Sequence, residues 1–211
     1  MKGDTYMPGP PKTDLVQPTP EARFWAWFAD NSERLMDFEQ DQDRVFDELS
    51  VALAQVHEGL TFEFGPREAN HREFVVSADG QRQRFPAVTQ LVAAAPAFSN
   101  WTIMAFRQPK GTRFTIEYDG NELAPDAIWF HAEPDGERIG LTLYVRGFSA
   151  HTQEFVQNAS FILLDAALGE YTMETRIGFV QWQRLPAYPA EQGLHSFHNL
   201  PGLISGWANT A

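Results

Sequence analysis

The sequence predicts an α+β fold in which two amino-terminal helices precede a largely antiparallel sheet with helices packed on one face. Apolar residues recur at helical spacing over residues 20–57. From residue 60 the apolar period changes to two, and most strands follow strands, which favours antiparallel pairing. The chain has 211 residues, of which 43% are hydrophobic, so we expect one domain with a large core over residues 20–211.

Residues 1–19 are expected to form a flexible proline-rich arm, because proline fixes φ and lacks an amide donor. Thr19 is the predicted N-cap of the first helix, with Pro20 at its first position. The apolar face of this helix consists of Phe24, Phe28, Leu35 and Phe38. A second helix is expected over residues 43–57, ending at Gly59.

The rest of the chain is expected to be strands with two inserted helices. Helices are expected over residues 85–95 and 152–168, and an irregular tail from about residue 185 with one short helix near Leu203. The expected strands are 60–65, 72–77, 101–106, 113–118, 127–132, 139–145, 171–177 and 179–183. The same order of a strand pair, a helix and a Trp-containing strand occurs in residues 60–106 and again in residues 127–183. Either a duplicated ββαββ unit or chance would explain this recurrence.

Charge and composition exclude several classes of protein. The formal net charge is −12 without any cluster of Lys and Arg, which argues against nucleic acid or an anionic membrane as a partner. The absence of Cys excludes disulfides, thiolate metal sites and Cys nucleophiles. No apolar run reaches the roughly 20 residues of a membrane span, and residues 1–21 do not resemble a signal peptide, so we expect a cytoplasmic protein.

An acidic segment joins the first two helices. Residues 30–48 contain eight acidic and two basic side chains. One interpretation is a solvated surface that maintains solubility. The other is a docking patch for a basic protein partner. That candidate patch comprises Trp25, Trp27, Asp37, Asp41, Asp43 and Asp47.

The helix predicted over residues 152–168 carries a polar stripe beside its apolar face. The stripe consists of His151, Glu154, Asn158 and Asp165, and Glu170 follows at the corner after Gly169. Asp165 lies in an apolar stretch, so it should be partly buried and needs a partner such as Arg176. The stripe either faces a cleft as an acid/base or ligand-binding set, or locks the helix to a neighbouring loop; the sequence favours the second interpretation.

Catalytic motifs are missing. The sequence contains no Gly-x-Ser-x-Gly elbow, no P-loop and no Gly-x-Gly-x-x-Gly. His195 and His198 have a spacing that chelates metal in a helix, but they lie in a proline-rich tail without the glutamate of the zinc-protease motif. We therefore expect neither a metal nor a cofactor, and the absence of motifs makes an enzyme the less favoured hypothesis.

Three segments resemble a family of bacterial proteins of about 200 residues that has no assigned function. They are Phe-Trp-Ala-Trp-Phe at 24–28, Leu-Asp-Ala-Ala-Leu-Gly-Glu-Tyr at 164–171 and Thr-Arg-Ile-Gly at 175–178. The resemblance runs from about residue 22 to the end of the chain. It implies a bacterial cytoplasmic protein with an α+β fold, and it carries no catalytic residues.

Two functional hypotheses follow. The first is a non-catalytic binding protein for a protein partner or small ligand, for example an immunity-type protein that binds a basic partner. The alternative is an enzyme or small-ligand sensor that uses the polar stripe, which predicts a concave pocket over the helix at 152–168. A homodimer is a third hypothesis, and an exposed hydrophobic sheet face would be its sign.

Overall fold

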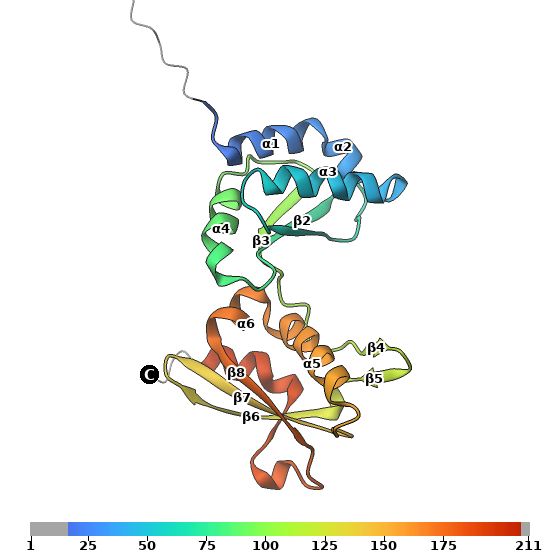
Figure 1. The fold of residues 1–211 in the computed structure, drawn as a ribbon, viewed down its shortest axis with the longest axis vertical. Helices are drawn as coiled ribbons and strands as arrows, with labels where there is room; N and C mark the ends of the chain where they lie inside the picture. Colours follow the sequence, from blue (N-terminus) through green and yellow to red (C-terminus); the bar gives the residue numbers. More distant parts are fainter. Residues whose placement is uncertain (1–16, 208–211) are drawn as a thin grey trace, which may run out of the picture.

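The computed structural model describes residues 17–207 as two lobes stacked along the long axis of the molecule (Figure 1). Each lobe has its own cluster of buried apolar side chains. The predicted arm at residues 1–19 lies almost entirely outside the described residues.

The first lobe is built from helices that cover one face of a small sheet. α1 (Pro20–Asp30) begins as predicted at Thr19, whose hydroxyl accepts a hydrogen bond of 3.2 Å from the Ala22 N–H. α1 is followed by its C-cap Asn31, after which α2 (Ser32–Met36) begins. α3 (Gln42–Ala54) and α4 (Phe85–Ala93) complete the layer.

The sheet of the first lobe has three strands in the order β1-β2-β3. β1 (Thr61–Phe64) pairs antiparallel with β2 (Arg72–Ser77), and β2 pairs parallel with β3 (Trp101–Ala105), which the chain reaches through α4. Phe74 and Val76 of β2 point to the same face because side chains alternate along a strand. That face packs on the helices, in a core that includes Phe24, Trp25, Phe28, Leu49, Leu53, Val88 and Leu91.

The second lobe contains a four-stranded sheet in the order β8-β7-β6-β9. Its elements are β6 (Ile128–Asp135), β7 (Arg138–Val145), α5 (Gln153–Leu168), α6 (Glu170–Arg176), β8 (Ile177–Arg184), β9 (His195–Ser196) and α7 (Leu200–Trp207). α5 and α7 pack on the same core as Phe130 and Leu143 of the sheet. A separate hairpin, β4 (Ile116–Tyr118) and β5 (Asn121–Leu123), lies beside α5 (Figure 1). None of the helices in residues 17–207 combines the length and apolar character needed to cross a membrane.

Both lobes repeat one topology, in which an antiparallel hairpin is followed by a helix and a strand parallel to the second hairpin strand. The parallel pairs are β2 with β3 and β7 with β8. Each pair is extended by one backbone hydrogen bond beyond its last pair, from Phe106 N–H to the Val76 carbonyl (2.8 Å) and from Leu185 N–H to the Val145 carbonyl (3.1 Å). The α+β class with mostly antiparallel pairing is confirmed, with the strands divided among three sheets. The repeated unit is ββαβ, and its origin by duplication stays a hypothesis.

Several sequence-based expectations differ from the structure. The apolar face Phe24, Phe28, Leu35 and Phe38, expected on one helix, is divided among α1, α2 and a 3-10 turn at Phe38–Gln40, and the helix expected over residues 43–57 ends at Ala54. Residues 171–177 are not a strand: α6 occupies Glu170–Arg176, and β8 begins at Ile177. The tail from residue 185 contains the short helix expected near Leu203, which is α7, but it is more ordered than expected because β9 joins the sheet. The single domain stays a prediction, since two separate cores are joined by the junction described next.

Candidate functional site

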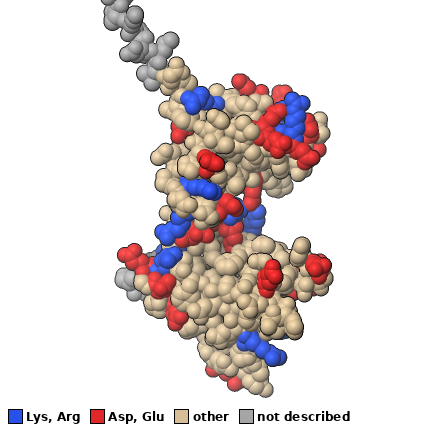
Figure 2. All heavy atoms as spheres, viewed as in Figure 1, with Lys and Arg blue, Asp and Glu red and all other residues tan. Residues whose placement is uncertain are grey.

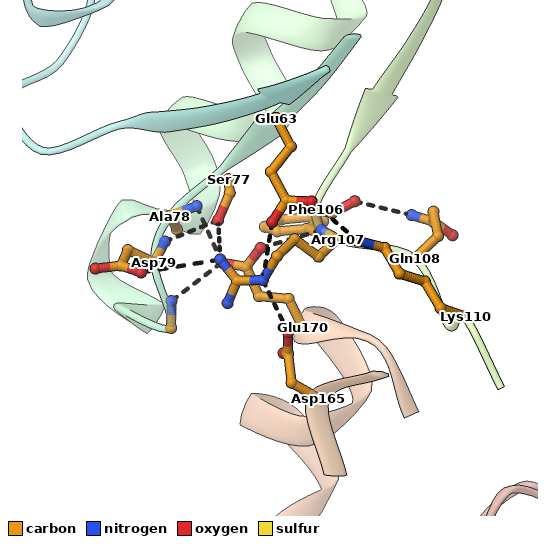
Figure 3. Close-up of polar contacts among 11 residues, drawn as sticks. Glu63, Ser77, Ala78, Asp79, Phe106, Arg107, Gln108, Lys110, Asp165 and Glu170 are labelled. Atoms are coloured by element: carbon orange, nitrogen blue, oxygen red, sulfur yellow. Dashed lines mark hydrogen bonds and ion pairs between the residues drawn. The ribbon is translucent and has the colours of Figure 1, made fainter. Parts of the chain in front are cut away.

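A buried carboxylate joins the two lobes. Glu170, the first residue of α6, is fully buried. One of its carboxylate oxygens accepts the N–H groups of Ala78 (3.0 Å) and Gly80 (3.1 Å), and the other accepts that of Arg107 (3.2 Å). The Glu170 N–H in turn donates to the Arg107 carbonyl at 2.9 Å. Figure 3 shows Glu170 reaching from the second lobe into the loops that follow β2 and β3.

Unusual backbone angles shape these loops. Asp79 and Gly80, an Asp-Gly pair of the kind that favours turns, have φ of 51° and 69°, and Phe106 has φ of 65°. Gly169 has φ of 77°, and a Cβ there would lie 3.0 Å from the Arg107 carbonyl oxygen. Glycine is therefore required immediately before Glu170, for both its backbone angle and its close approach to the first lobe.

Arg107 holds the other side of the junction. Its Nε donates to Asp165 at 2.8 Å and its Nη1 donates to the Ser77 hydroxyl at 2.9 Å (Figure 3). Burial lowers the pKa of Arg107, but the hydrogen bond to Asp165 and the surrounding carboxylates outweigh it, so the pKa is raised overall. Asp165 was expected to need a partner such as Arg176, and its partner is an arginine, Arg107.

Two cavities lie along α5, and Ile162 contributes to the lining of both. The first, of about 570 Å³, lies between the lobes and includes Arg107 and Asp165. The second, of about 490 Å³, lies between α5 and the β4–β5 hairpin. We call their combined surface the α5 groove.

Charges in the first cavity are mostly paired with one another. Arg107 bonds Asp165, and Lys110 bonds Glu63 at 3.2 Å. Figure 2 shows this mixture of acidic and basic side chains at the waist between the lobes. Glu174 also lines this cavity, and burial, with the nearby charge of Glu170, raises the pKa of its carboxyl.

Charges in the second cavity are not paired. The cavity is lined by the carboxylates of Glu117, Asp119 and Glu154, none of which has an ion pair or hydrogen bond within residues 17–207. Beside them lie Tyr118, which is 75% exposed, and Ile162, which is 52% exposed. This end of the α5 groove therefore combines uncompensated negative charge with accessible aromatic and apolar surface.

The predicted polar stripe is brought to the groove in part. His151, Glu154 and Asn158 line the second cavity, and Asp165 lines the first. A concave surface over the helix is thus present, as the ligand hypothesis required. Glu170 is instead enclosed in the junction, neither lining a site nor exposed in a turn.

Sequence reasoning missed the residues that other segments contribute to this site. Arg107 directly follows the strand predicted to end at residue 106, Glu117 lies in the strand predicted over residues 113–118, and Asp119 directly follows that strand. Residues at strand ends and turns are frequent in binding sites. Their location next to a predicted strand end is the feature of the sequence that could have identified these residues. Their partners across the lobes depend on tertiary structure and leave no local pattern.

The predicted interaction patch needs correction at its aromatic end. Trp25 is 3% exposed, and its indole N–H donates to the Leu91 carbonyl at 2.7 Å, so it is a core residue and no part of a surface. Trp27 is half-buried against the same core. A helix that packs on both a sheet and α4 buries a wider face than one apolar stripe indicates.

The acidic end of the patch is on the surface but partly neutralised. Asp37 pairs with Arg67, and elsewhere in the segment Arg72 pairs with Glu39 at 2.7 Å. Figure 2 shows basic side chains among the acidic ones at this corner of the upper lobe. Three acidic residues of the patch are exposed without an ion pair within the described chain, namely Asp41, Asp43 and Asp47.

Metal ligation has no support in the described part of the chain. No group of three or more His, Asp or Glu side chains within residues 17–207 is arranged to hold a metal ion. His198 contacts the Thr112 hydroxyl at 2.9 Å and Asp126 at 3.2 Å, and His195 lies exposed on β9.

Comparison of this chain with protein-family models, with curated proteins and with solved structures finds no match. The resemblance to an uncharacterised bacterial family therefore stays a hypothesis. Function has to be argued from the α5 groove itself.

Proposed function

We propose that this protein is a non-catalytic binding protein that accepts a basic segment of a protein partner in the α5 groove. The observation that carries the proposal is the set of unpaired carboxylates of Glu117, Asp119 and Glu154 in one cavity. An immunity-type protein that binds a basic toxin is one form of this function.

Electrostatics support a cationic occupant. Like charges that share a cavity repel one another, and a Lys or Arg side chain brought among them relieves that repulsion. The phenol ring of Tyr118 offers a face for a cation, and Ile162 offers apolar surface for the methylene stem of Lys or Arg. Small anions and nucleic acid are disfavoured by the same charges.

Catalysis by the polar stripe is the less favoured alternative. Asp165 is neutralised by Arg107, and Glu170 is saturated by three N–H donors. Asp165 and Glu170 are therefore not free to act as a general acid/base pair, which leaves only His151 and Glu154 of this set unpaired. His151 and Glu154 remain in the groove as binding groups.

The test is a nuclear magnetic resonance titration with a capped hexapeptide of alternating Arg and Gly. We expect saturable shifts confined to residues 116–121 and 151–162. The variant E117Q/D119N/E154Q should bind about ten-fold more weakly, because each exposed ion pair contributes about 0.2–1 kcal/mol. The matched control, D41N/D43N/D47N, removes the same charge from the other acidic surface and should bind as the wild type does.

Three results would count against the proposal. Equal weakening in both triple variants would show attraction to net charge alone. Chemical-shift changes centred on residues 30–48 would show that the peptide binds the amino-terminal acidic surface and not the α5 groove. Tighter binding of spermidine than of the peptide, lost in the groove variant, would assign the groove to a small cation and reject a protein partner.

A further inference from the structure

The second lobe contains a crevice equivalent to the one that Glu170 fills in the first. In sheets with parallel strands, ligands bind where neighbouring strands end at their carboxyl side and the chain diverges. In the first lobe this place lies between the loops after β2 and β3, and it holds the Glu170 carboxylate. A carboxylate therefore suits this topology without any metal or cofactor.

The register of the parallel strands locates the equivalent crevice. Val76 pairs with Ala105 at the end of β2 and β3, and Val145 pairs with Arg184 at the end of β7 and β8. Beyond these pairs lies a cavity of about 400 Å³, whose lining includes Trp129, Arg146, Gly147, Arg184 and Leu185. A Cβ built on Gly147 would meet nothing within 4 Å, which agrees with open space beside this loop.

The hydrogen-bond donors differ between the two crevices. In the first lobe, main-chain N–H groups bind the carboxylate. In the second, Pro186 has no N–H, and the Ser149 N–H already donates to the Thr152 hydroxyl at 3.0 Å. Two arginine side chains stand at this crevice, and guanidinium groups match the geometry of a carboxylate well.

Both arginines are free to bind. Within residues 17–207 neither Arg146 nor Arg184 forms an ion pair or a side-chain hydrogen bond, although the chain has a net charge of −12. No Asp or Glu lines the cavity. Two unpaired guanidinium groups at one cavity, in so acidic a protein, are therefore a feature that calls for an anionic occupant.

We propose that the crevice between the ends of β7 and β8 binds a carboxylate through Arg146 and Arg184, with Trp129 packing against the carbon atoms that carry it. The carboxylate belongs either to an acidic side chain of a peptide or to a small organic acid. This site is separate from the α5 groove, and its occupancy does not depend on the function proposed for that groove.

The experiment follows the indole N–H resonance of Trp129, assigned with a W129F variant, during titration. The probes are a capped Gly-Glu-Gly peptide, succinate, and a capped Gly-Gln-Gly peptide as the neutral control. We expect saturable shifts with the two carboxylates and none with the glutamine peptide. R146A and R184A should each weaken binding about ten-fold, since a charge-assisted hydrogen bond is lost.

Controls separate this site from attraction by net charge. R113A removes an exposed arginine elsewhere in the second lobe, and it should leave binding unchanged. R146K and R184K keep the charge and should recover part of the affinity lost in the alanine variants.

The relative affinity of the two carboxylate probes identifies the source of the ligand. No saturable shift, or an equal loss in R113A, would overturn the site. Binding of inorganic phosphate in the absence of carboxylate binding would overturn the assignment of the ligand.

Discussion

Replacing Glu170 should separate the two lobes. Glu170→Ala leaves three N–H donors without their acceptor. The donor of Ala78 is buried, and an orphaned buried donor costs about 1–3 kcal/mol. The donors of Gly80 and Arg107 are partly buried beside a cavity of about 570 Å³, so water replaces their partner and each loses about 1 kcal/mol.

Together these terms destabilise Glu170→Ala by about 3–5 kcal/mol, which is a large part of the stability of a typical domain. Glu170→Gln retains an acceptor for Ala78 and Gly80 but turns an amide group toward the N–H of Arg107. It should therefore cost about 1–3 kcal/mol, less than the alanine variant.

The assay is urea unfolding followed by circular dichroism and tryptophan fluorescence. The wild type should unfold in one transition, as the single-domain prediction requires, and Glu170→Ala in two, one for each core. The control is Glu154→Ala, which removes an exposed carboxylate without a bond and should stay within about 0.5 kcal/mol of the wild type. If Glu170→Ala also stays within that range, the buried carboxylate does not join the lobes.

Three other substitutions test further features. Burial and the charge of Glu170 raise the pKa of the Glu174 carboxyl, so the folded wild type loses stability as pH rises from about 4.3, where the unfolded chain gives up this proton. In thermal denaturation Glu174→Gln should therefore gain stability relative to the wild type between pH 4 and pH 7. A stability difference between the two proteins that stays the same over this pH range would contradict the prediction. Trp25→Phe should cost about 1–3 kcal/mol by urea unfolding, because a buried carbonyl loses its indole donor, and a neutral result would contradict the core assignment. Gly140→Ala should destabilise the protein by about 1–3 kcal/mol in the same assay, because the new Cβ would overlap the Phe179 ring. The control Gly202→Ala, in α7, places its Cβ in open space and should be neutral or stabilising. Equal effects of the two substitutions would refute the packing argument.

Local patterns predicted most elements of the fold. β2 spans Arg72–Ser77, as its alternating pattern predicts, and α5 ends at Leu168 before Gly169, as predicted. α5 buries one continuous face, and β2, the central strand of its sheet, is buried on both faces except at Glu73. Burial and local preference agree in both elements. α6 was missed because Tyr171, Met173 and Thr175 alternate with polar residues like a strand, whereas anchoring of Glu170 in the first lobe and stacking of Tyr171 on Phe85 hold this segment as a helix.

The candidate site was predicted only on the helix that carries its clearest pattern. The stripe from His151 to Asp165 follows from helical spacing, because one helix determines which of its residues share a face. The facing residues of the groove come from other segments: Arg107 lies 58 residues before Asp165. Pairings over such distances depend on how the lobes are arranged, and spacing along the chain does not encode them.

The long separation in sequence between the two halves of the junction has a consequence during synthesis. Glu170 follows Arg107 by 63 residues. At about 5–20 residues per second a ribosome needs about 3–13 s to cover that interval. The first lobe can therefore fold on the ribosome while the loops after β2 and β3 still face water, ready to accept any carboxylate nearby. Once Glu170 has been synthesised and binds these loops, no other carboxylate can bind there. A nascent chain that pauses between the two lobes is therefore the form whose loops bind acidic segments of other proteins most readily.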